Sequence, residues 1–246
     1  MSDGPAIDMG RVPRHVGLIM DGNGRWAESR GMHRTQGHAA GEAALFDVVD
    51  GALELGVEWV TAYTFSTENW KRSAEEVEFL LHFNVEVLQR RRDALHEKGV
   101  RIRFIGDRFD PRVHDGLRNE FAEAEKMTRD NSTLELVLAF NYGGRAEIVE
   151  AARRLAAEAA AGQQDPEAIT DAGLAQHLSI AEMPDVDLLI RSSGEFRTSN
   201  FLIWQATYAE IVVSPLMWPE FSKEALFDCI REYQSRDRRF GAAGGT

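Results

Sequence analysis

The chain has 246 residues, of which 43% are hydrophobic and 28% charged, a composition that excludes a largely disordered, a collagen-like or a coiled-coil protein. Its 28 Lys and Arg residues against 40 Asp and Glu residues give a formal charge of −12, which argues against general nucleic-acid binding but not against a locally basic pocket. The single cysteine, Cys229, excludes an intramolecular disulfide, and the lack of a signal sequence or long apolar run leads us to expect a cytoplasmic protein.

Short apolar segments alternate with longer amphipathic ones along the first half of the chain. Three strands are expected there: 15–20, 59–65 and 100–105. Two helices are expected between them: 39–55 and 73–99. Gly56 fits the end of the first helix. Ser73 and Glu76 have the spacing of a capping box, which predicts the start of the second helix.

The second half continues the same alternation. Three further strands are expected: 134–140, 186–191 and 209–213. Helices are expected to begin at Asp110–Pro111, with proline in the first position, and to span 146–161, 171–178 and 222–235. Strands separated by helices predict parallel β-α-β units. We therefore expect one α/β domain over residues 1–246, with a mostly parallel central sheet of about six strands flanked by helices on both faces, a flexible segment 1–12 and a tail 242–246.

The segment after the first strand has the character of a phosphate site. It reads DGNGRW over residues 21–26, and Arg34 and His38 follow nearby. Ligands of open parallel sheets bind beyond the carboxyl ends of the strands. Two glycines allow close backbone approach, N–H groups leading into a helix attract anions, and Arg25 adds a positive charge. Neither a Walker A loop nor a dinucleotide fingerprint is present, so we interpret this segment as a different phosphate cradle.

Two more strand ends carry dense polar chemistry. FSTENWKR at 65–72 combines hydroxyl, carboxylate, amide, indole and cationic groups, and RSSGEFRTSNF at 191–201 places two arginines and three serines around a glycine. Arginine binds phosphate oxygens in bidentate fashion, so facing basic sites indicate two phosphorylated substrates. Asp21 and Glu210 are the carboxylates that we expect to hold Mg²⁺, which commonly bridges carboxylate and phosphate oxygens.

Six motifs in order, from Pro13 to Gly241, resemble the cis-prenyltransferases, the undecaprenyl diphosphate synthase family. The motifs are HVGLIMDGNGRWA, RTQGH, FSTENWKR, NYGGR, RSSGEFRTSNFLIWQATYAE and RRFG. The resemblance implies an Mg²⁺-dependent homodimeric transferase that condenses isopentenyl diphosphate with an allylic diphosphate, farnesyl or geranyl, in Z configuration. Thr67 and the pair Ser192-Ser193 depart slightly from common family spellings, but they remove no charge and no metal ligand.

The resemblance also implies roles for individual residues. Asp21 takes the place of the catalytic aspartate and a metal ligand, Asn69 that of a proton acceptor, and Glu210 that of a second metal carboxylate. The implied substrate-binding residues are Gly22, Asn23, Gly24, Arg25, Trp26, Arg34 and His38 for the allylic diphosphate; Ser66, Thr67, Glu68, Trp70 and Arg72 in a closing loop; and Arg191, Arg197 and Ser199, with Thr198 beside them, for isopentenyl diphosphate. Arg239 and Gly241 are implied to reach the site of the partner subunit. Whether Asn69, Asp21 or diphosphate accepts the proton stays open.

An apolar tunnel for the growing chain is implied as well. The candidate wall residues are Val77, Leu80, Leu81, Val87, Leu88, Leu136, Leu138 and Phe140, each of which also fits an ordinary core. Thr64 is small and near the implied wall, so we expect a long-chain product for cell-wall carrier lipid, released more readily on transient contact with a membrane. A short-chain Z-prenyl product is the alternative.

Other functions fit the sequence less well. An all-helical trans-type synthase would carry adjacent aspartates, and this chain has no Asp-Asp pair. A non-catalytic partner subunit of the same family would lack the loop residues that are present here, among them Asp21, Arg25 and Asn69. A sugar-phosphate- or nucleotide-binding domain is the remaining alternative, and failure to bind farnesyl diphosphate would favour it.

Overall fold

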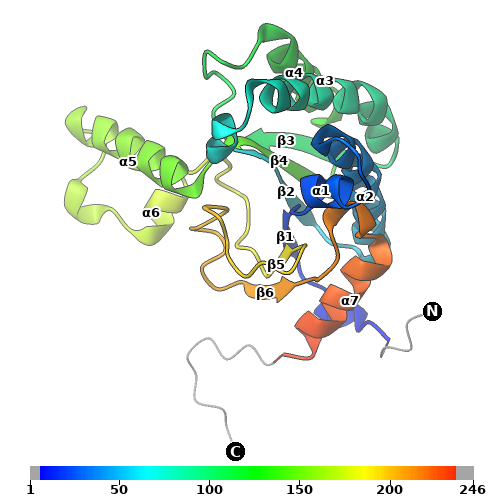
Figure 1. Ribbon diagram of the computed structural model, residues 1–246. Coiled ribbons are helices and arrows are strands. Elements are labelled where there is room, and N and C mark those ends of the chain that lie inside the picture. The colour runs from blue at the N-terminus through cyan, green and yellow to red at the C-terminus, as the bar shows by residue number, and fades with distance from the viewer. Residues whose placement is uncertain (1–5, 237–246) are drawn as a thin grey trace, which may run out of the picture.

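The computed structural model of the chain describes residues 6–236, and these form one six-stranded parallel sheet (Figure 1). The strands are β1 His15–Ile19, β2 Trp59–Ser66, β3 Val100–Ile105, β4 Leu134–Tyr142, β5 Leu188–Arg191 and β6 Glu210–Val213. Their order is β3-β4-β2-β1-β5-β6, and every neighbouring pair is parallel. The predicted α/β sheet of about six strands is therefore confirmed. The winding changes direction between β1 and β5, and such a switch point opens a crevice at the carboxyl ends of the strands.

Most of the long helices cover one face of the sheet. The α-helices are α1 Asn23–Glu28, α2 Arg34–Leu55, α3 Ala74–Glu97, α4 Asp115–Thr128, α5 Gly144–Ala160, α6 Asp171–Ala175 and α7 Lys223–Gln234. Short 3-10 turns are η1 Met9–Arg11, η2 Thr67–Lys71, η3 Pro166–Ala168 and η4 Trp218–Glu220. The main apolar cluster joins the sheet to α2, α3, α4 and α7.

The other face is covered differently from our expectation. Its buried apolar cluster draws on the strands and on non-helical residues such as Ile180, Met183 and Phe201. The α5 and α6 helices extend away from the sheet rather than lying across it (Figure 1). The prediction of helices on both faces was thus wrong, because loops rather than helices supply the apolar side chains that close this face.

Local side-chain chemistry explains where the helices start. The Ser73 side chain accepts a hydrogen bond from the Glu76 N–H, as the capping box predicted. By contrast, α4 does not begin at Asp110–Pro111. The Asp110 carboxylate accepts hydrogen bonds from the backbone and side chain of Arg112 and closes a turn, so the helix starts at Asp115, after His114 as its cap.

The chain ends differ from expectation in one respect. Residues 6–12 were expected to be flexible, but Asp8 and Gln234 exchange hydrogen bonds of 3.0 and 2.8 Å, and Ile7 and Val12 pack against the main core. The C-terminal motif containing Arg239 and Gly241 lies outside the described residues. Among residues 6–236, none of the helices combines the length and apolar character needed to cross a membrane.

Candidate active site

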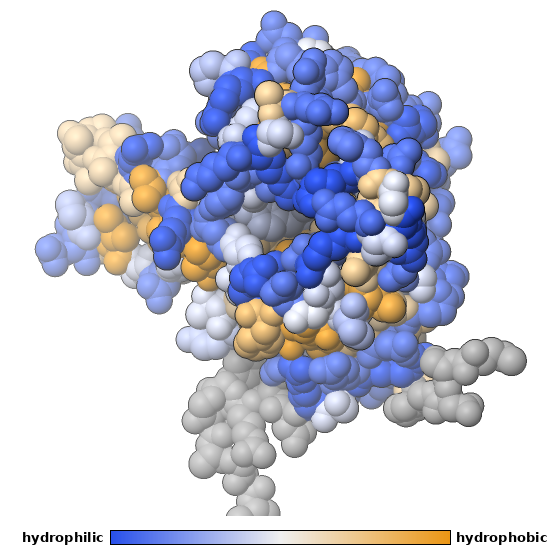
Figure 2. All heavy atoms as spheres, viewed as in Figure 1, coloured by the Kyte–Doolittle hydropathy of each residue, from blue (hydrophilic) through white to orange (hydrophobic). Residues whose placement is uncertain are grey.

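The segments after β1 and β5 meet at the carboxyl edge of the sheet. Ile19 and Arg191 are register partners at the ends of these two strands. Figure 2 shows a hollow on this side of the molecule, rimmed by hydrophilic residues. The loop after β2 adjoins the same cavity, since Ser66 and Asn69 line it together with Asp21. The structure therefore brings all three polar strand ends of the sequence to one place.

Asp21 is held between two arginines. Its Oδ2 atom lies 2.7 Å from Nη2 of Arg191, and its Oδ1 atom lies 3.3 Å from Nη2 of Arg25. Burial by itself favours the protonated acid, but the hydrogen bond and charge of Arg191, the Gly22 N–H and the charge of Arg25 hold the pKa of the Asp21 carboxyl below its usual value. Asp21 is consequently an anion at neutral pH.

The two glycines of the DGNGR segment are each required for a different steric reason. Gly22 has φ of +98°, and a Cβ atom there would lie 2.9 Å from Oγ of Ser193. At Gly24 a Cβ atom would lie 2.6 Å from the guanidinium of Arg34. The second glycine thus lets the Arg34 guanidinium lie directly against the backbone of α1, whose first N–H groups have no partner within the helix. The Arg34 guanidinium and the free N–H groups of the first turn of α1 therefore lie close together.

The Glu76 carboxylate lies close to three predicted substrate-binding residues: Arg34 and His38 of the allylic diphosphate site, and Arg72 of the closing loop. It lies 2.7 Å from Arg72, 3.5 Å from His38 and 3.7 Å from Arg34. The residue is only 8% exposed. The contact with His38 and the charges of Arg72 and Arg34 lower the pKa of Glu76 to about 2, although burial opposes this.

The spacing of Ser73 and Glu76 predicted only a capping role for Glu76. The signal that pointed further was its position four residues after Arg72, where the two side chains can reach each other.

The loop 66–72 is held by its own side chains and by the NYGGR motif. Oδ1 of Asn69 accepts a hydrogen bond from the Ser66 N–H, which closes a capping box around η2. Nε1 of Trp70 donates to Oδ1 of Asn141 at 2.7 Å, and the indole packs edge-on against Phe65. The Trp70 ring therefore anchors the loop. It does not line the cavity.

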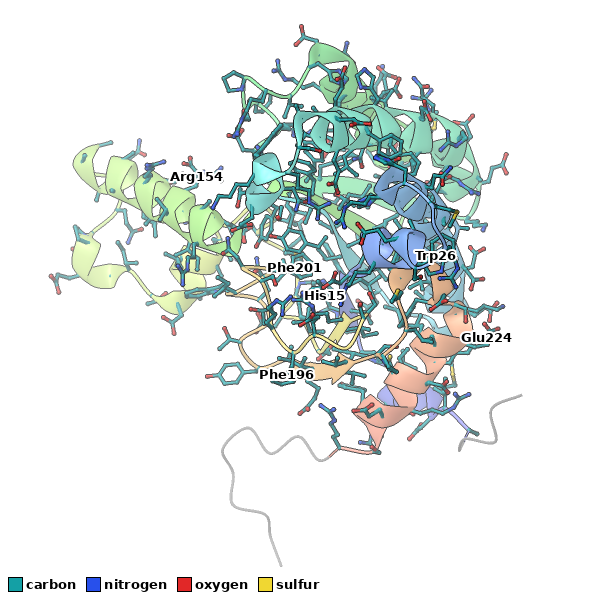
Figure 3. The ribbon with its side chains drawn as sticks, viewed as in Figure 1. His15, Trp26, Arg154, Phe196, Phe201 and Glu224 are labelled. Atoms are coloured by element: carbon teal, nitrogen blue, oxygen red, sulfur yellow. The ribbon has the colours of Figure 1, made fainter. Side chains whose placement is uncertain are left out.

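The third segment presents a buried and an exposed arginine. Arg191 is 4% exposed and donates to Oγ of Ser199 at 2.7 Å and to the carbonyl of Arg197 at 2.6 Å. The Arg197 side chain is more than half exposed and pairs with Glu195, which also lies 3.5 Å from Arg25. Each arginine of this segment is thus paired with a carboxylate, Arg191 with Asp21 and Arg197 with Glu195. Phe196, beside them, projects at the surface with 76% exposure (Figure 3).

Glu210 is the predicted site residue that the structure separates from the others. It begins β6, where it pairs with Leu188, and Leu188 pairs with Val16 near the start of β1. Asp21 lies beyond the other end of β1, about 16 Å away along the strand direction at about 3.3 Å per residue. The Glu210 carboxylate instead binds Arg236 at 2.9 Å. One chain therefore does not bring Glu210 to its own Asp21, and the expected metal pair stays a prediction.

A cavity of about 620 Å³ continues inward from the polar edge. Most of the predicted apolar wall lines it: Leu80, Val87, Leu88, Leu136, Leu138 and Phe140. Thr64 lines it too, whereas Val77 and Leu81 belong to the packed core. A volume of this size lies in the range of small-molecule sites. The charged edge of the sheet and the apolar cavity are therefore parts of one continuous site.

The predicted polar residues divide into two groups around this cavity. Those that line it are Asp21, Asn23, His38, Ser66, Glu68, Asn69, Arg72, Arg191 and Ser199. Those that lie outside its lining are Gly22, Gly24, Arg25, Trp26, Arg34, Thr67, Trp70, Arg197, Thr198 and Glu210. Three of the latter contact residues of the site. Arg25 pairs with Asp21, Arg34 pairs with Glu76 beside Arg72 and His38, and the Arg197 carbonyl accepts from Arg191.

Known proteins similar to this chain agree with one another. The family model described as "Putative undecaprenyl diphosphate synthase" matches residues 19–241. Isoprenyl transferase 2 of Corynebacterium efficiens is 54% identical over 239 residues, covering 97% of this chain and 98% of that protein. The decaprenyl diphosphate synthase of Mycobacterium tuberculosis is 52% identical over 233 residues, covering 95% of this chain and 78% of that protein. Lavandulyl diphosphate synthase from Lavandula x intermedia, solved in complex with dimethylallyl diphosphate, has a TM-score of 0.90 at 35% identity and covers 94% of this chain and 99% of that one.

Proposed function

The chain belongs to the undecaprenyl diphosphate synthase family of cis-prenyltransferases, and we propose that it condenses isopentenyl diphosphate with an allylic diphosphate, such as farnesyl or geranyl diphosphate, to make a long-chain Z-polyprenyl diphosphate. One observation carries this proposal: the cationic edge around Asp21 and Arg191 opens into a cavity lined by Leu88 and Leu138. A diphosphate head and a hydrocarbon tail need this combination. The similarity to a decaprenyl diphosphate synthase supports a long product.

The alternatives fit the cavity less well. A sugar phosphate or nucleotide would leave the apolar interior without a matching ligand, so the cavity disfavours a binding domain of that kind. A non-catalytic subunit would not need an ionised Asp21 beside Arg191 and Arg25. A short-chain Z-prenyl synthase remains the second candidate, because the small Thr64 beside the cavity allows a long tail without requiring one.

We assign the allylic diphosphate to the side of the site formed by α1, α2 and the loop 66–72. Arg34, His38 and Arg72 converge there on Glu76, and Arg34 also lies against the α1 backbone at Gly24. Charge-assisted hydrogen bonds to phosphate are about twice as strong as neutral ones. Two arginines and a histidine held by one buried carboxylate supply such contacts with little reorganisation. The remaining groups of this subsite are Gly22, Asn23, Arg25, Trp26, Ser66, Thr67 and Glu68.

Isopentenyl diphosphate is assigned to the segment after β5. Arg191 and Ser199 line the cavity, and Arg197 and Thr198 belong to the same segment. Because Arg191 also binds Asp21 at 2.7 Å, the two subsites adjoin at this ion pair. The alkene of one substrate can therefore be held near C1 of the other, and orientation of this kind supplies much of a rate enhancement.

The chemical step follows from the charges. Breaking the C1–O bond of the allylic diphosphate develops negative charge on the diphosphate and positive charge on carbon. Arg34, Arg72 and the N–H groups of α1 are in place before that charge develops, which is the most effective form of electrostatic stabilisation. A new C–C bond then forms, and a proton leaves C2 of the added unit. Asn69, Asp21 and the diphosphate itself are the candidate acceptors.

The residues present fit a divalent metal bound jointly with substrate. Within residues 6–236, no three His, Cys, Asp or Glu side chains come together as a metal-binding group. Mg²⁺ typically uses one or two carboxylates together with phosphate oxygens and water. Asp21, ionised and partly exposed, is the residue that would hold it. When bound, Mg²⁺ would neutralise charge on the leaving diphosphate.

We infer that the active form is a homodimer. Since Glu210 is remote from Asp21 in its own chain, it can act on a substrate-bound metal only from a second subunit. Arg236, which pairs with Glu210 at 2.9 Å, is three residues before Arg239 in the sequence. The exposed rings of Phe196 and Tyr208 are aromatic surface that a second subunit could bury. Release of the apolar product is expected to be faster on transient contact with a membrane.

The assay for this function uses purified protein, Mg²⁺, labelled isopentenyl diphosphate and either farnesyl or geranyl diphosphate. Formation of extractable polyprenyl diphosphate that requires both substrates supports the proposal. Tight binding of farnesyl diphosphate without elongation would favour a non-catalytic subunit. Failure to bind it would favour a nucleotide- or sugar-phosphate-binding domain.

A further inference from the structure

A charged group interrupts the apolar wall of the cavity where α2 and α3 face each other. Glu42 of α2 accepts from Nη2 of Arg90 at 2.7 Å and from Nε of Arg91 at 2.8 Å, both on α3. The Glu42 side chain is only 10% exposed. Burial disfavours its charge, but the two arginines hold the pKa of Glu42 below its usual value. An ionised carboxylate therefore joins the two helices across the edge of the cavity.

The group faces the cavity and not only solvent. Glu42 and Arg91 both line the cavity, beside the apolar residues Leu45 and Leu88. Positions 80, 84, 88, 91 and 95 of α3 recur every three or four residues and so share one face of the helix. Arg91 is the charged residue in that row, and its guanidinium lies 4.8 Å from the ring centroid of Phe46 on α2. A hydrocarbon tail that follows this wall inward would meet an ion pair.

The room for a growing tail is finite. A tail that has filled the cavity of about 620 Å³ can lengthen further only if part of the wall moves. On the sheet side the wall is fixed by the ladder of β2 and β4. On the α2–α3 side the ion pairs of Glu42 join the helices through side chains alone.

We propose that Glu42, Arg90 and Arg91 form a latch between α2 and α3 that determines product length in this enzyme. A short tail fits the cavity with the latch closed. A longer tail has to part Glu42 from its arginines, so each addition beyond that point is disfavoured and the chain is released instead. This inference rests on the proposed function, and it names the residues that set the upper limit of the product.

The test measures product length in variants of the latch. Glu42→Gln keeps the size of the side chain and removes its charge, and Arg91→Met keeps an unbranched stem against Phe46 without the guanidinium. The control is Glu86→Gln: Glu86 pairs with the same Arg90 at 3.2 Å, but its side chain is 62% exposed and outside the cavity. Each variant is incubated with farnesyl diphosphate, labelled isopentenyl diphosphate and Mg²⁺, and the dephosphorylated products are sized by chromatography.

We expect the main product of Glu42→Gln and of Arg91→Met to lengthen by one or more isoprene units, and Glu86→Gln to match the wild type. Unchanged or shorter products in both latch variants, with thermal unfolding like that of the wild type, would overturn the latch. The same lengthening in Glu86→Gln would also overturn it, because removing any carboxylate that pairs with Arg90 would then lengthen the product, whether or not it lines the cavity. If Glu42→Gln does not fold, the product length of Arg91→Met alone tests the latch, because Arg91 is a partly exposed side chain whose replacement should be tolerated. Absence of any elongation by the wild type would overturn the proposed function, and the latch with it.

Discussion

Oδ2 of Asp21 lies 2.7 Å from Nη2 of Arg191, and this contact joins two segments 170 residues apart in the chain. Asp21 follows β1 and Arg191 ends β5, on the two sides of the point where the winding of the sheet reverses. The pair links the subsite assigned to the allylic diphosphate with the subsite assigned to isopentenyl diphosphate. A bound metal or diphosphate at either residue therefore changes the electrostatics of the other.

Asp21→Asn is expected to lower turnover by about a hundredfold or more, the loss typical for removal of a preorganised charge at a reacting centre. Asparagine keeps the shape and can still accept from Arg191, so circular dichroism should show an unchanged fold. Turnover is measured at saturating substrates and Mg²⁺. Activity close to that of the wild type would contradict the assignment of Asp21.

Arg34→Ala and Arg197→Ala should separate the two subsites. Arg34 lies against α1 and Glu76, so its loss should raise mainly the KM for the allylic diphosphate. Arg197 belongs to the segment after β5, where its carbonyl accepts from Arg191, so its loss should raise mainly the KM for isopentenyl diphosphate. A lost charge-assisted contact costs about 1.5–3 kcal/mol, or about 10- to 150-fold. The two-site assignment fails if both variants weaken the same substrate and spare the other.

Glu76 should make stability depend on pH in the acid range. Its pKa of about 2 in the folded protein is below the ordinary value of 4.5, so its stabilising effect is complete above about pH 4.5 and declines as the pH falls toward 2. Glu76→Gln should therefore lower the Tm at pH 7 more than at pH 3. Glu28→Gln is the control, because Glu28 is a half-exposed partner of Arg34. An equal loss of Tm at both pH values would contradict the role of Glu76 as a counter-ion.

Thr64→Leu should shorten the products. Thr64 lines the cavity and donates to the carbonyl of Ala139 at 3.0 Å, so it stands at a fixed point beside the sheet. A larger side chain there takes volume from the growing tail. Product sizing is the measurement, and the KM for farnesyl diphosphate should change little. Products as long as those of the wild type would show that the tail does not pass Thr64.

Asp21→Ala and Arg239→Ala test whether two subunits share each site. Alone, each variant should be nearly inactive. Co-expressed with different tags, they should form about half heterodimers by random mixing, so about a quarter of all sites would carry both wild-type residues in a two-fold assembly. Activity should rise to about that fraction. If tagged heterodimers co-purify and activity stays at the level of the single variants, Arg239 does not act on the partner's site.

Much of this arrangement could be predicted from the sequence. Apolar runs separated by helices indicated a parallel sheet, and the polar segments after β1, β2 and β5 had to share one edge of it. What the sequence did not indicate were contacts across the fold. The contacts of Glu76 with Arg34, His38 and Arg72 depend on α2 lying beside the loop 66–72. The hydrogen bond from Trp70 to Asn141 depends on β2 and β4 being neighbours in the sheet.

Glu210 lies at the opposite end of its strand from the anion-binding segments. The expected strand 209–213 already placed it at the amino end of a parallel strand, whereas the anion-binding segments follow the carboxyl ends. The register of β5 and β6 shows that Asp21 and Glu210 do not meet within one chain. A second subunit would bring a Glu210 carboxylate to Asp21, and for this reason we include subunit sharing in the proposed function.

The geometry of the newly formed double bonds tests the central claim most directly. The wild-type protein is incubated with farnesyl diphosphate, ¹³C-labelled isopentenyl diphosphate and Mg²⁺, and the dephosphorylated product is examined by NMR. Our account predicts a polyprenyl product in which each double bond formed by the enzyme has Z configuration. Newly formed E double bonds, or farnesyl diphosphate recovered unchanged from a folded protein with both substrates present, would contradict it.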